Sequence, residues 1–314
     1  MKNTNNIIKS YKNLDIKEKI KQLCEIEPSI LSSDSLDCSY NFCKNIALKH
    51  YENFPVGSIL IPRQARKHFY SIYAFSRFAD DIADIPNIFS SEERIEFLSK
   101  YENLLELCQS EKTSNPIFLA LINTIKNFNI PISTLKKLIS AFKMDINFKQ
   151  ADSIKDLEHY CSFSANPVGE LVLRLFNNYN DDTVIFSDSI CTGLQLLNFW
   201  QDLSLDLKNG RSYIPKEYEE KHSITSKDFS KKNGNLKLNN CLNELLELTE
   251  SYFIQGEQIL KLINNKRLKL ELKVIIEAAL YFIKIMKKNP ANLLIARPKI
   301  SKTEKVTILI KALF

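Results

Sequence analysis

The sequence predicts an all-α fold, and three observations support this prediction. Apolar residues recur at every third or fourth position through most of the chain, which is the spacing of one face of an α-helix. Alternating apolar and polar runs, which are typical of half-buried β-strands, are scarce. Apolar residues make up 44% of the 314 residues, enough to form the core of one large domain or of two small ones.

The sequence divides into a polar N-terminal segment and a longer region with a helical pattern. Residues 1–35 are rich in Asn, Lys and Ser, and they are predicted to form a loosely attached leader. Beyond them, no fixed repeat and no shift in composition marks a second domain, so residues 36–314 are predicted to form a single α-helical domain. The expected helices span about 36–51, 63–84, 91–108, 116–128, 133–148, 153–165, 167–178, 183–208, 236–263, 266–288 and 301–312.

Local signals place several of these boundaries. Ser90, with a glutamate three residues later, has the pattern of a capping box, and Ser133 and Ser153 precede regular apolar runs as helix caps do. Gly210 follows the long helix that begins near residue 183, and glycine is favoured just beyond a helix C-terminus. Pro167 falls within an otherwise continuous helical pattern, so we expect a break or kink there.

The composition argues against several classes of protein. Only six glycines occur, roughly 2% against a typical ~7%, and no two lie close enough for a phosphate-binding or dinucleotide-binding loop. The four histidines and seven cysteines show neither CxxC nor HExxH spacing, so we expect neither a zinc site nor a Cys/His protease. No nucleic-acid partner is expected, because the basic residues match no reader motif.

Charge and cysteine content bear on location. The odd number of cysteines suits a reducing compartment, and the chain begins without a continuous apolar core, so a cytoplasmic location is expected. Residues 266–314 hold twelve Lys/Arg against three Glu. This basic end either favours an anionic lipid surface, which would make the protein peripheral to the inner membrane, or forms only the solvated faces of Lys-rich helices.

The first informative pattern is the segment FSRFADDIAD, which carries a stripe of charged residues on an apolar helix. At about 100° per residue, Asp84 lies about 40° and Arg77 about 60° from Asp80 around the helix axis. These three side chains therefore share one narrow face.

A second stripe lies in GLQLLNFWQDLSLD. Relative to Asp202, Asp206 lies at about 40°, Gln195 at about 20° and Asn198 at about −40°. This helix also gathers acidic and amide groups onto one side of an apolar sequence.

Two such stripes together favour a metal-dependent site. Like-charged carboxylates four residues apart repel each other, and the cost rises when they enter a cavity without a counter-charge. Mg²⁺ is typically held by one or two carboxylates and by phosphate oxygens of a substrate, so two facing stripes could clamp a diphosphate. A single DxxxD is more often an ordinary exposed acidic pair, but two stripes with amide or guanidinium companions favour the metal.

From Asp37 to Leu313 the chain resembles the squalene and phytoene synthase family. The motifs YAFSRFADDIAD and LQLLNFWQDLSLDLKNGRSYIP stand in that family's order and at roughly its separation. The segments HYENFPVGS and YCSFSANPVGELVLRL look most like those of bacterial hydroxysqualene synthases of the HpnC type. Gln201 stands where many members have Arg, and Ser76 replaces the usual Cys before the first-motif arginine.

This resemblance implies an isoprenoid synthase type of helical bundle around a central cavity, with the two acidic helices facing each other near its mouth. It also implies roles for individual residues. The implied Mg²⁺ ligands are Asp80, Asp84, Asn198, Asp202 and Asp206. The four aspartates are also assigned to catalysis, together with Tyr160. The residues assigned to substrate binding are His50, Asn53, Phe54, Arg77, Asn166, Gln195, Asn198, Arg211 and Tyr213.

For the HpnC-type subgroup, the resemblance implies that presqualene diphosphate is ionised and that one water captures the rearranged cation to give hydroxysqualene, in squalene and hopanoid biosynthesis. Mg²⁺ is the expected cofactor, NADPH is not expected, and other enzymes of the pathway are possible partners. Asn166 or Tyr160 is a hypothetical holder of the water. One alternative condenses two farnesyl diphosphates to presqualene diphosphate or squalene, or two longer chains to phytoene. Another is a catalytically inactive helical assembly or membrane-docking protein.

Overall fold

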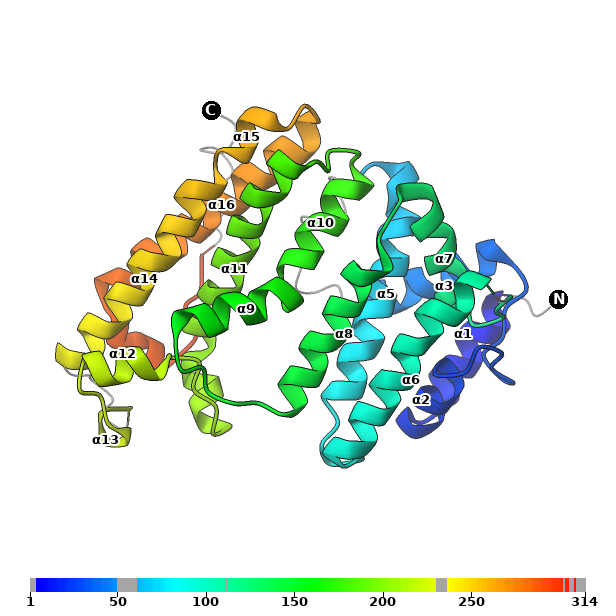
Figure 1. Ribbon diagram of the computed structural model, residues 1–314, viewed down its shortest axis with the longest axis horizontal. Coiled ribbons are helices and arrows are strands. Elements are labelled where there is room, and N and C mark those ends of the chain that lie inside the picture. Colours follow the sequence, from blue (N-terminus) through cyan, green and yellow to red (C-terminus); the bar gives the residue numbers. More distant parts are fainter. Residues whose placement is uncertain are drawn as a thin grey trace. The chain divides into compact units, whose positions relative to one another are not determined.

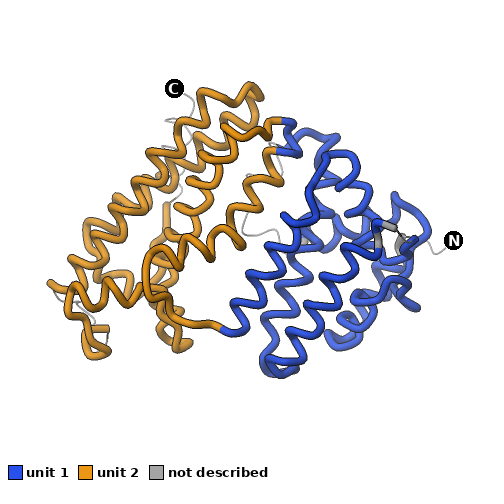
Figure 2. Tube along the Cα trace, in the orientation of Figure 1, with its two compact units in different colours: residues 1–147, 174–177 blue, residues 148–173, 178–314 orange. Residues whose placement is uncertain are grey.

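The computed structural model describes residues 4–49, 61–110, 112–229, 236–301, 303–304 and 308. Within these residues the regular elements are helices and no strand occurs, which confirms the all-α prediction (Figure 1). The chain divides into two compact units, residues 1–147 with 174–177 and residues 148–173 with 178–314 (Figure 2). The predicted leader boundary and the predicted single domain stay predictions, and each unit is described by itself.

The first unit is built around a helix that is buried along one side. Its helices are α1 (Thr4–Asn13), α2 (Ile16–Leu23), α3 (Leu36–Lys49), α5 (Arg63–Ala83), α6 (Ser91–Ser110), α7 (Pro116–Phe128) and α8 (Ile132–Ile146). Helix α5 packs against α3, α6, α7 and α8. Phe75, Phe78 and Ile82 are almost fully buried along it at helical spacing, and the Phe75 ring stacks on that of Tyr101. The core therefore fixes the rotation of α5 about its axis.

Residues 4–35 pack against the rest of this unit. Ile7, Ile20 and Leu23 are almost fully buried, so the apolar sides of α1 and α2 face the protein. Asn115 donates hydrogen bonds of 2.9 Å from Nδ2 to the carbonyl oxygens of Leu23 and Glu25. Short helices of this length need tertiary packing to form in water, and this burial supplies it.

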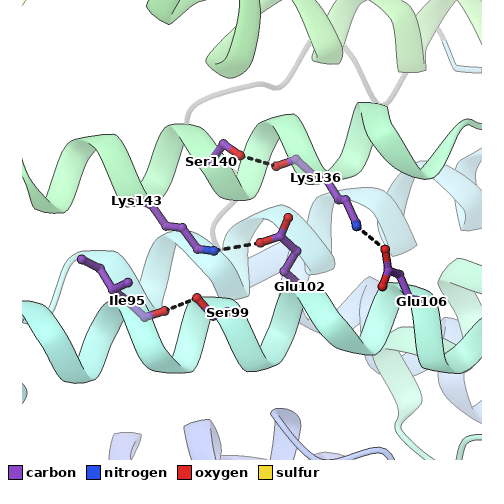
Figure 3. A network of polar contacts seen from close by, with 7 residues as sticks. All are labelled: Ile95, Ser99, Glu102, Glu106, Lys136, Ser140 and Lys143. Carbon is purple, nitrogen blue, oxygen red and sulfur yellow. Dashed lines mark hydrogen bonds and ion pairs between the residues drawn. The ribbon is translucent and has the colours of Figure 1, made fainter.

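Surface ion pairs join α6 to α8 in the same unit, as Figure 3 shows. Lys143 Nζ lies 2.8 Å from Glu102 Oε2, and Lys136 pairs with Glu106 one turn away. Solvent-accessible pairs near a protein surface contribute about 0–1 kcal/mol each, so the apolar core rather than these pairs holds the helices together.

The second unit is organised around one long helix. It contains α9 (Ile154–Ser164), most of α10 (Asn166–Leu175), α11 (Asp181–Lys208), α12 (Lys216–Lys221), α13 (Ser226–Phe229), α14 (Leu236–Gly256), α15 (Ile259–Leu262), α16 (Lys266–Lys288) and the 3-10 helix η2 (Pro290–Leu294). Helix α14 packs along α11, and the buried Trp200 donates a 2.8 Å hydrogen bond to Thr249 across that contact. A β-carbon on Gly256 would lie 3.1 Å from the carbonyl oxygen of Phe186, so glycine permits this close approach.

The sequence signals are mostly confirmed. The capping boxes at Ser90 and Ser153 form. The helical pattern is interrupted at Ala165, between α9 and α10, and Gly210 adopts a left-handed φ of 72° after α11. The predicted cap at Ser133 is wrong, because α8 begins at Ile132, directly after a proline. Helices α1, α2, α12 and α13 were not expected, and most of the helix expected over 301–312 lies outside the described residues.

Candidate active site

The first acidic stripe lies at the C-terminal end of α5. Arg77 spans two carboxylates, with Nη1 2.8 Å from Asp80 Oδ2 and Nη2 2.6 Å from Asp81 Oδ1. Asp84 is the first residue beyond the helix, its backbone N–H donates to the carbonyl oxygen of Asp80, and its side chain is exposed. The structure thus brings Arg77, Asp80 and Asp84 together, as the stripe predicted, and adds Asp81.

The electrostatics of this stripe favour a bound cation. The pKa of Asp80 is raised from 3.8 to about 6 by burial and by the negative charges of Asp84, Asp81 and Asp145, against the opposing effect of Arg77. A carboxyl group whose pKa is raised in this way gains from any added positive charge. A divalent cation between Asp80 and Asp84 would supply that charge.

A cavity of about 350 Å³ adjoins this stripe within the first unit. Its lining residues come from α1, α2, α3, α5 and the turn after α5: Tyr11, Ile16, Lys19, Ile46, Arg77, Asp81, Asp84 and Ile85. The roles assigned from the sequence do not include Asp81, Tyr11 or Lys19. The sequence motif contained Asp81, but nothing in the spacing linked Tyr11 or Lys19 to it.

The second acidic stripe lies near the C-terminal end of α11. Because α11 is continuous from Asp181 to Lys208, the predicted face forms, with Asp202 and Asp206 half-buried, Gln195 partly buried and Asn198 exposed. Neither the Gln195 nor the Asn198 side chain has a hydrogen bond with another described residue, so their assignment stays a prediction.

The charges of this stripe are only partly compensated. Arg297 Nε lies 3.1 Å from Asp202 Oδ1, yet that buried oxygen accepts no hydrogen bond from the described residues. Burial raises the pKa of Asp202, and Arg297 opposes the rise. Burial and the charge of Asp202 raise the pKa of Asp206, against Arg211. A buried carboxylate oxygen without a hydrogen bond is costly, so it is a candidate metal ligand.

The turn after α11 returns a second arginine to the stripe. The backbone N–H of Arg211 donates a 2.9 Å hydrogen bond to the carbonyl oxygen of Asp206, across the left-handed turn at Gly210. The Arg211 guanidinium carbon lies 5.4 Å from the centroid of the Phe148 ring. Arg211 is thus held beside Asp206, as its assignment to substrate binding requires.

An aromatic cluster borders this second stripe. The Tyr213 ring stacks on that of Phe199 with centroids 3.9 Å apart and an interplanar angle of 10°. The Tyr160 ring lies 5.9 Å from Phe199, and Phe148 packs edge-on against Tyr213 at 5.1 Å. Two helices, α9 and α11, together with the segment before α9 and the turn after α11, therefore bring Tyr160 and Tyr213 to the same aromatic cluster.

Asn166 lies at the break between α9 and α10. Its Oδ1 accepts a 3.1 Å hydrogen bond from the Thr192 hydroxyl on α11. This bond orients the amide so that its NH₂ group, which has no partner among the described residues, remains able to donate. Three assigned substrate-binding residues, His50, Asn53 and Phe54, lie outside the described residues.

The aspartates of the two stripes are suitable ligands for Mg²⁺. Each stripe offers two aspartates, all-oxygen ligands that suit a hard cation. Among the residues the structure describes, no three His, Cys, Asp or Glu side chains gather closely enough to hold a metal on their own. Mg²⁺ commonly takes its remaining ligands from substrate phosphates and water, so a pair of carboxylates suffices. The opposition of the two stripes across a central cavity stays a prediction.

No helix in the described part of the chain combines the length and the apolar character needed to cross a bilayer.

The chain is similar in sequence to proteins of one known family. A family model described as squalene/phytoene synthase matches residues 47–304. The hydroxysqualene synthase of Zymomonas mobilis is 30% identical over 227 residues, which cover 71% of this chain and 75% of that protein. The hydroxysqualene synthase of Rhodopseudomonas palustris is 31% identical over 225 residues, with the same two shares.

A solved structure agrees with these matches. The squalene synthase HpnC of Alicyclobacillus acidocaldarius superposes with a TM-score of 0.75 at 32% identity, over 81% of this chain and 94% of that one. Its fold is of the isoprenoid synthase type, and the fold-class prediction is confirmed.

Proposed function

The chain belongs to the squalene/phytoene synthase family, and we propose that it is a Mg²⁺-dependent enzyme that converts presqualene diphosphate to hydroxysqualene. Relatives named hydroxysqualene synthase, at 30% and 31% identity, support hydroxysqualene as the product. The observation that carries the proposal is that α5 and α11 each end in two carboxylates four residues apart with an arginine beside them.

The acidic stripes would hold the metal. We assign Asp80 and Asp84 in one unit, and Asp202 and Asp206 in the other, as ligands of Mg²⁺. Bound Mg²⁺ would act as a Lewis acid that stabilises charge on a departing diphosphate. Arg77 and Arg211 would add direct contacts to diphosphate oxygens, because guanidinium groups bind phosphate through paired N–H donors.

The aromatic cluster would stabilise the carbon fragment after the C–O bond to diphosphate breaks. The faces of Phe199, Tyr213 and Tyr160 present negative electrostatic potential, and each can favour a desolvated cation by up to ~2 kcal/mol. Water then forms a new C–O bond to the rearranged cation and loses a proton. The net reaction is replacement of diphosphate by a hydroxyl group, which needs no reductant.

Asn166 would hold the water that captures the cation. Thr192 fixes the Oδ1 end of its amide, so the NH₂ group is left to orient a water oxygen. An Asn166→Ala enzyme is expected to release less hydroxysqualene and more elimination product. Unchanged product proportions would remove Asn166 from this role.

Product identity tests the proposed function directly. The purified protein would be incubated with presqualene diphosphate or with farnesyl diphosphate, each with Mg²⁺, in H₂¹⁸O, with and without NADPH. We expect hydroxysqualene from presqualene diphosphate without NADPH, carrying one ¹⁸O atom. A requirement for NADPH with squalene as product, or turnover of farnesyl diphosphate alone, would contradict the proposal and favour the condensing alternative.

A further inference from the structure

The cavity beside the first acidic stripe has two unlike sides. One side is the end of α5 and its turn, with Arg77, Asp81 and Asp84. The other side includes residues of α1 and α2. Tyr11, Ile16 and Lys19 form this N-terminal wall. The roles assigned from the sequence include no residue of this wall.

The two cations that line the cavity are in different situations. Arg77 is engaged by two carboxylates, at 2.8 and 2.6 Å. Lys19 has no ion pair with any described residue, and its ammonium group lies 4.9 Å from the centroid of the Tyr11 ring. A partly buried ammonium group that touches an aromatic ring but no anion is well placed to accept an anionic ligand.

The wall is held firmly enough to place Lys19. The Tyr11 ring packs edge-on against Phe42 of α3 at 5.2 Å, and Asp15 caps α2 by accepting a 2.9 Å hydrogen bond from the Glu18 N–H. Ile20, the residue after Lys19, is fully buried. Lys19 therefore extends from an anchored helix into the cavity.

The charges that line the cavity set a condition on the ligand. Lys19 and Arg77 balance Asp81 and Asp84, so the lining carries no net charge when all four are ionised. An anion gains little there by itself. Mg²⁺ on Asp84 would make the lining positive, and a diphosphate bound to that Mg²⁺ would then lie near the Lys19 ammonium group.

We propose that Lys19 is a substrate-binding residue that contacts the diphosphate of the prenyl substrate, and that Tyr11 is a positioning residue for Lys19. This inference rests on the proposed function in one respect, namely that the first acidic stripe binds a Mg²⁺-diphosphate. It gives the N-terminal wall a role in binding the leaving group.

Calorimetry with inorganic pyrophosphate and Mg²⁺ tests the proposal apart from turnover. Lys19→Met is expected to raise the dissociation constant of pyrophosphate about 10-fold, because a charge-assisted hydrogen bond is lost. Lys19→Arg keeps the positive charge and is expected to retain most of the affinity. Lys21→Met is the matched control, since Lys21 is exposed on the same helix and does not line the cavity.

Variants of Tyr11 test the positioning role. Tyr11→Phe keeps the ring under the ammonium group and should bind pyrophosphate like the wild type, whereas Tyr11→Leu should weaken binding less than Lys19→Met does. In a Lys19→Met background, Tyr11→Leu should add nothing further. A further loss in that background would contradict positioning through Lys19.

The outcomes separate this inference from the proposed function. If Lys19→Met binds Mg²⁺-pyrophosphate like the wild type, or if Lys21→Met weakens it equally, the inference is overturned even when the wild type makes hydroxysqualene. If the wild type makes another product and Lys19→Met still weakens pyrophosphate binding, the inference holds and the proposed function fails. Melting curves of each variant would establish that the fold is intact.

Discussion

The two acidic stripes contain the same DxxxD spacing but are compensated in different ways. On α5, the cation is Arg77, three residues before Asp80 on the same helix. On α11, the ion-pair partner of Asp202 is Arg297, which is distant in sequence and half exposed, and Arg211 reaches Asp206 through a turn. The counter-charge of the first stripe is thus local, whereas that of the second depends on tertiary structure.

This difference indicates which arginine stays in the site when a ligand binds and which one a metal could replace. A cation fixed on the same helix at two short distances forms part of the site whether or not a ligand is bound. Arg297, with 51% of its side chain exposed and one contact at 3.1 Å, forms a pair that a bound metal could replace at little cost.

Removal of one carboxylate from either stripe should lower activity more than any other change considered below. Asp80→Asn and Asp202→Asn should each lower kcat/KM by at least about 100-fold, since each takes away charge that stabilises the departing diphosphate. Steady-state kinetics with presqualene diphosphate measures this. Asp152→Asn, on an exposed carboxylate of the second unit, serves as the control and should have no effect. A large loss from only one of the two variants would break the symmetry between the stripes.

Substitutions of Arg77 and Arg297 should lower kcat/KM by unequal factors, unlike those of Asp80 and Asp202. Arg77→Met leaves two carboxylates without their partner and removes a diphosphate contact, so kcat/KM should fall about 10-fold or more. Arg297→Met should change it by less than about 3-fold, because a half-exposed ion pair contributes little. Parallel kinetics on the two variants gives the comparison. Equal losses would mean that Arg297 also contacts the substrate.

The second stripe should be sensitive to packing between α11 and α14. Gly256→Ala places a methyl group against the α11 backbone, so the free energy of unfolding should fall by about 1–3 kcal/mol. Chemical denaturation measures the loss. Ser251→Ala, on the exposed side of α14, should change it by no more than about 0.5 kcal/mol. A neutral Gly256→Ala would show that this contact does not hold α11 in place.

The smallest effect concerns pH in the metal-free protein. The pKa of Asp80 is about 6 in the folded chain and 3.8 as a reference, so the folded state binds more protons between these values. Its contribution to stability is therefore complete below about pH 4 and is lost as pH rises through about 6. Carboxyl-carbon NMR titration, with Asp80→Asn to assign the signal, checks this. A midpoint near 4 would contradict the burial and crowding described for this stripe.

Much of the fold and part of the site could be predicted from the sequence. The periodicity of α5 and α11 placed each acidic set on one face, because helix geometry relates residues three and four apart without further information. The caps at Ser90 and Ser153 could also be predicted, because a capping box joins residues only three positions apart.

The remaining features depend on contacts between distant residues. No local pattern relates Arg297 to Asp202, or Lys19 to Asp81, since tertiary packing alone brings them near. The polar composition of residues 1–35 predicts a loosely attached leader, and it does not show that a few apolar side chains of α1 and α2, such as Ile20, pack on the rest of the first unit.

Crystals grown with Mn²⁺ and a non-ionisable thio analogue of farnesyl diphosphate would test the central claim most directly. Anomalous scattering locates the metal without assumptions about the ligands. We expect metal peaks bonded to carboxylate oxygens of Asp80 or Asp84 and of Asp202 or Asp206, each beside ordered diphosphate oxygens. Metal bound at one stripe only, or carboxylates that bind no metal beside an ordered diphosphate, would contradict it.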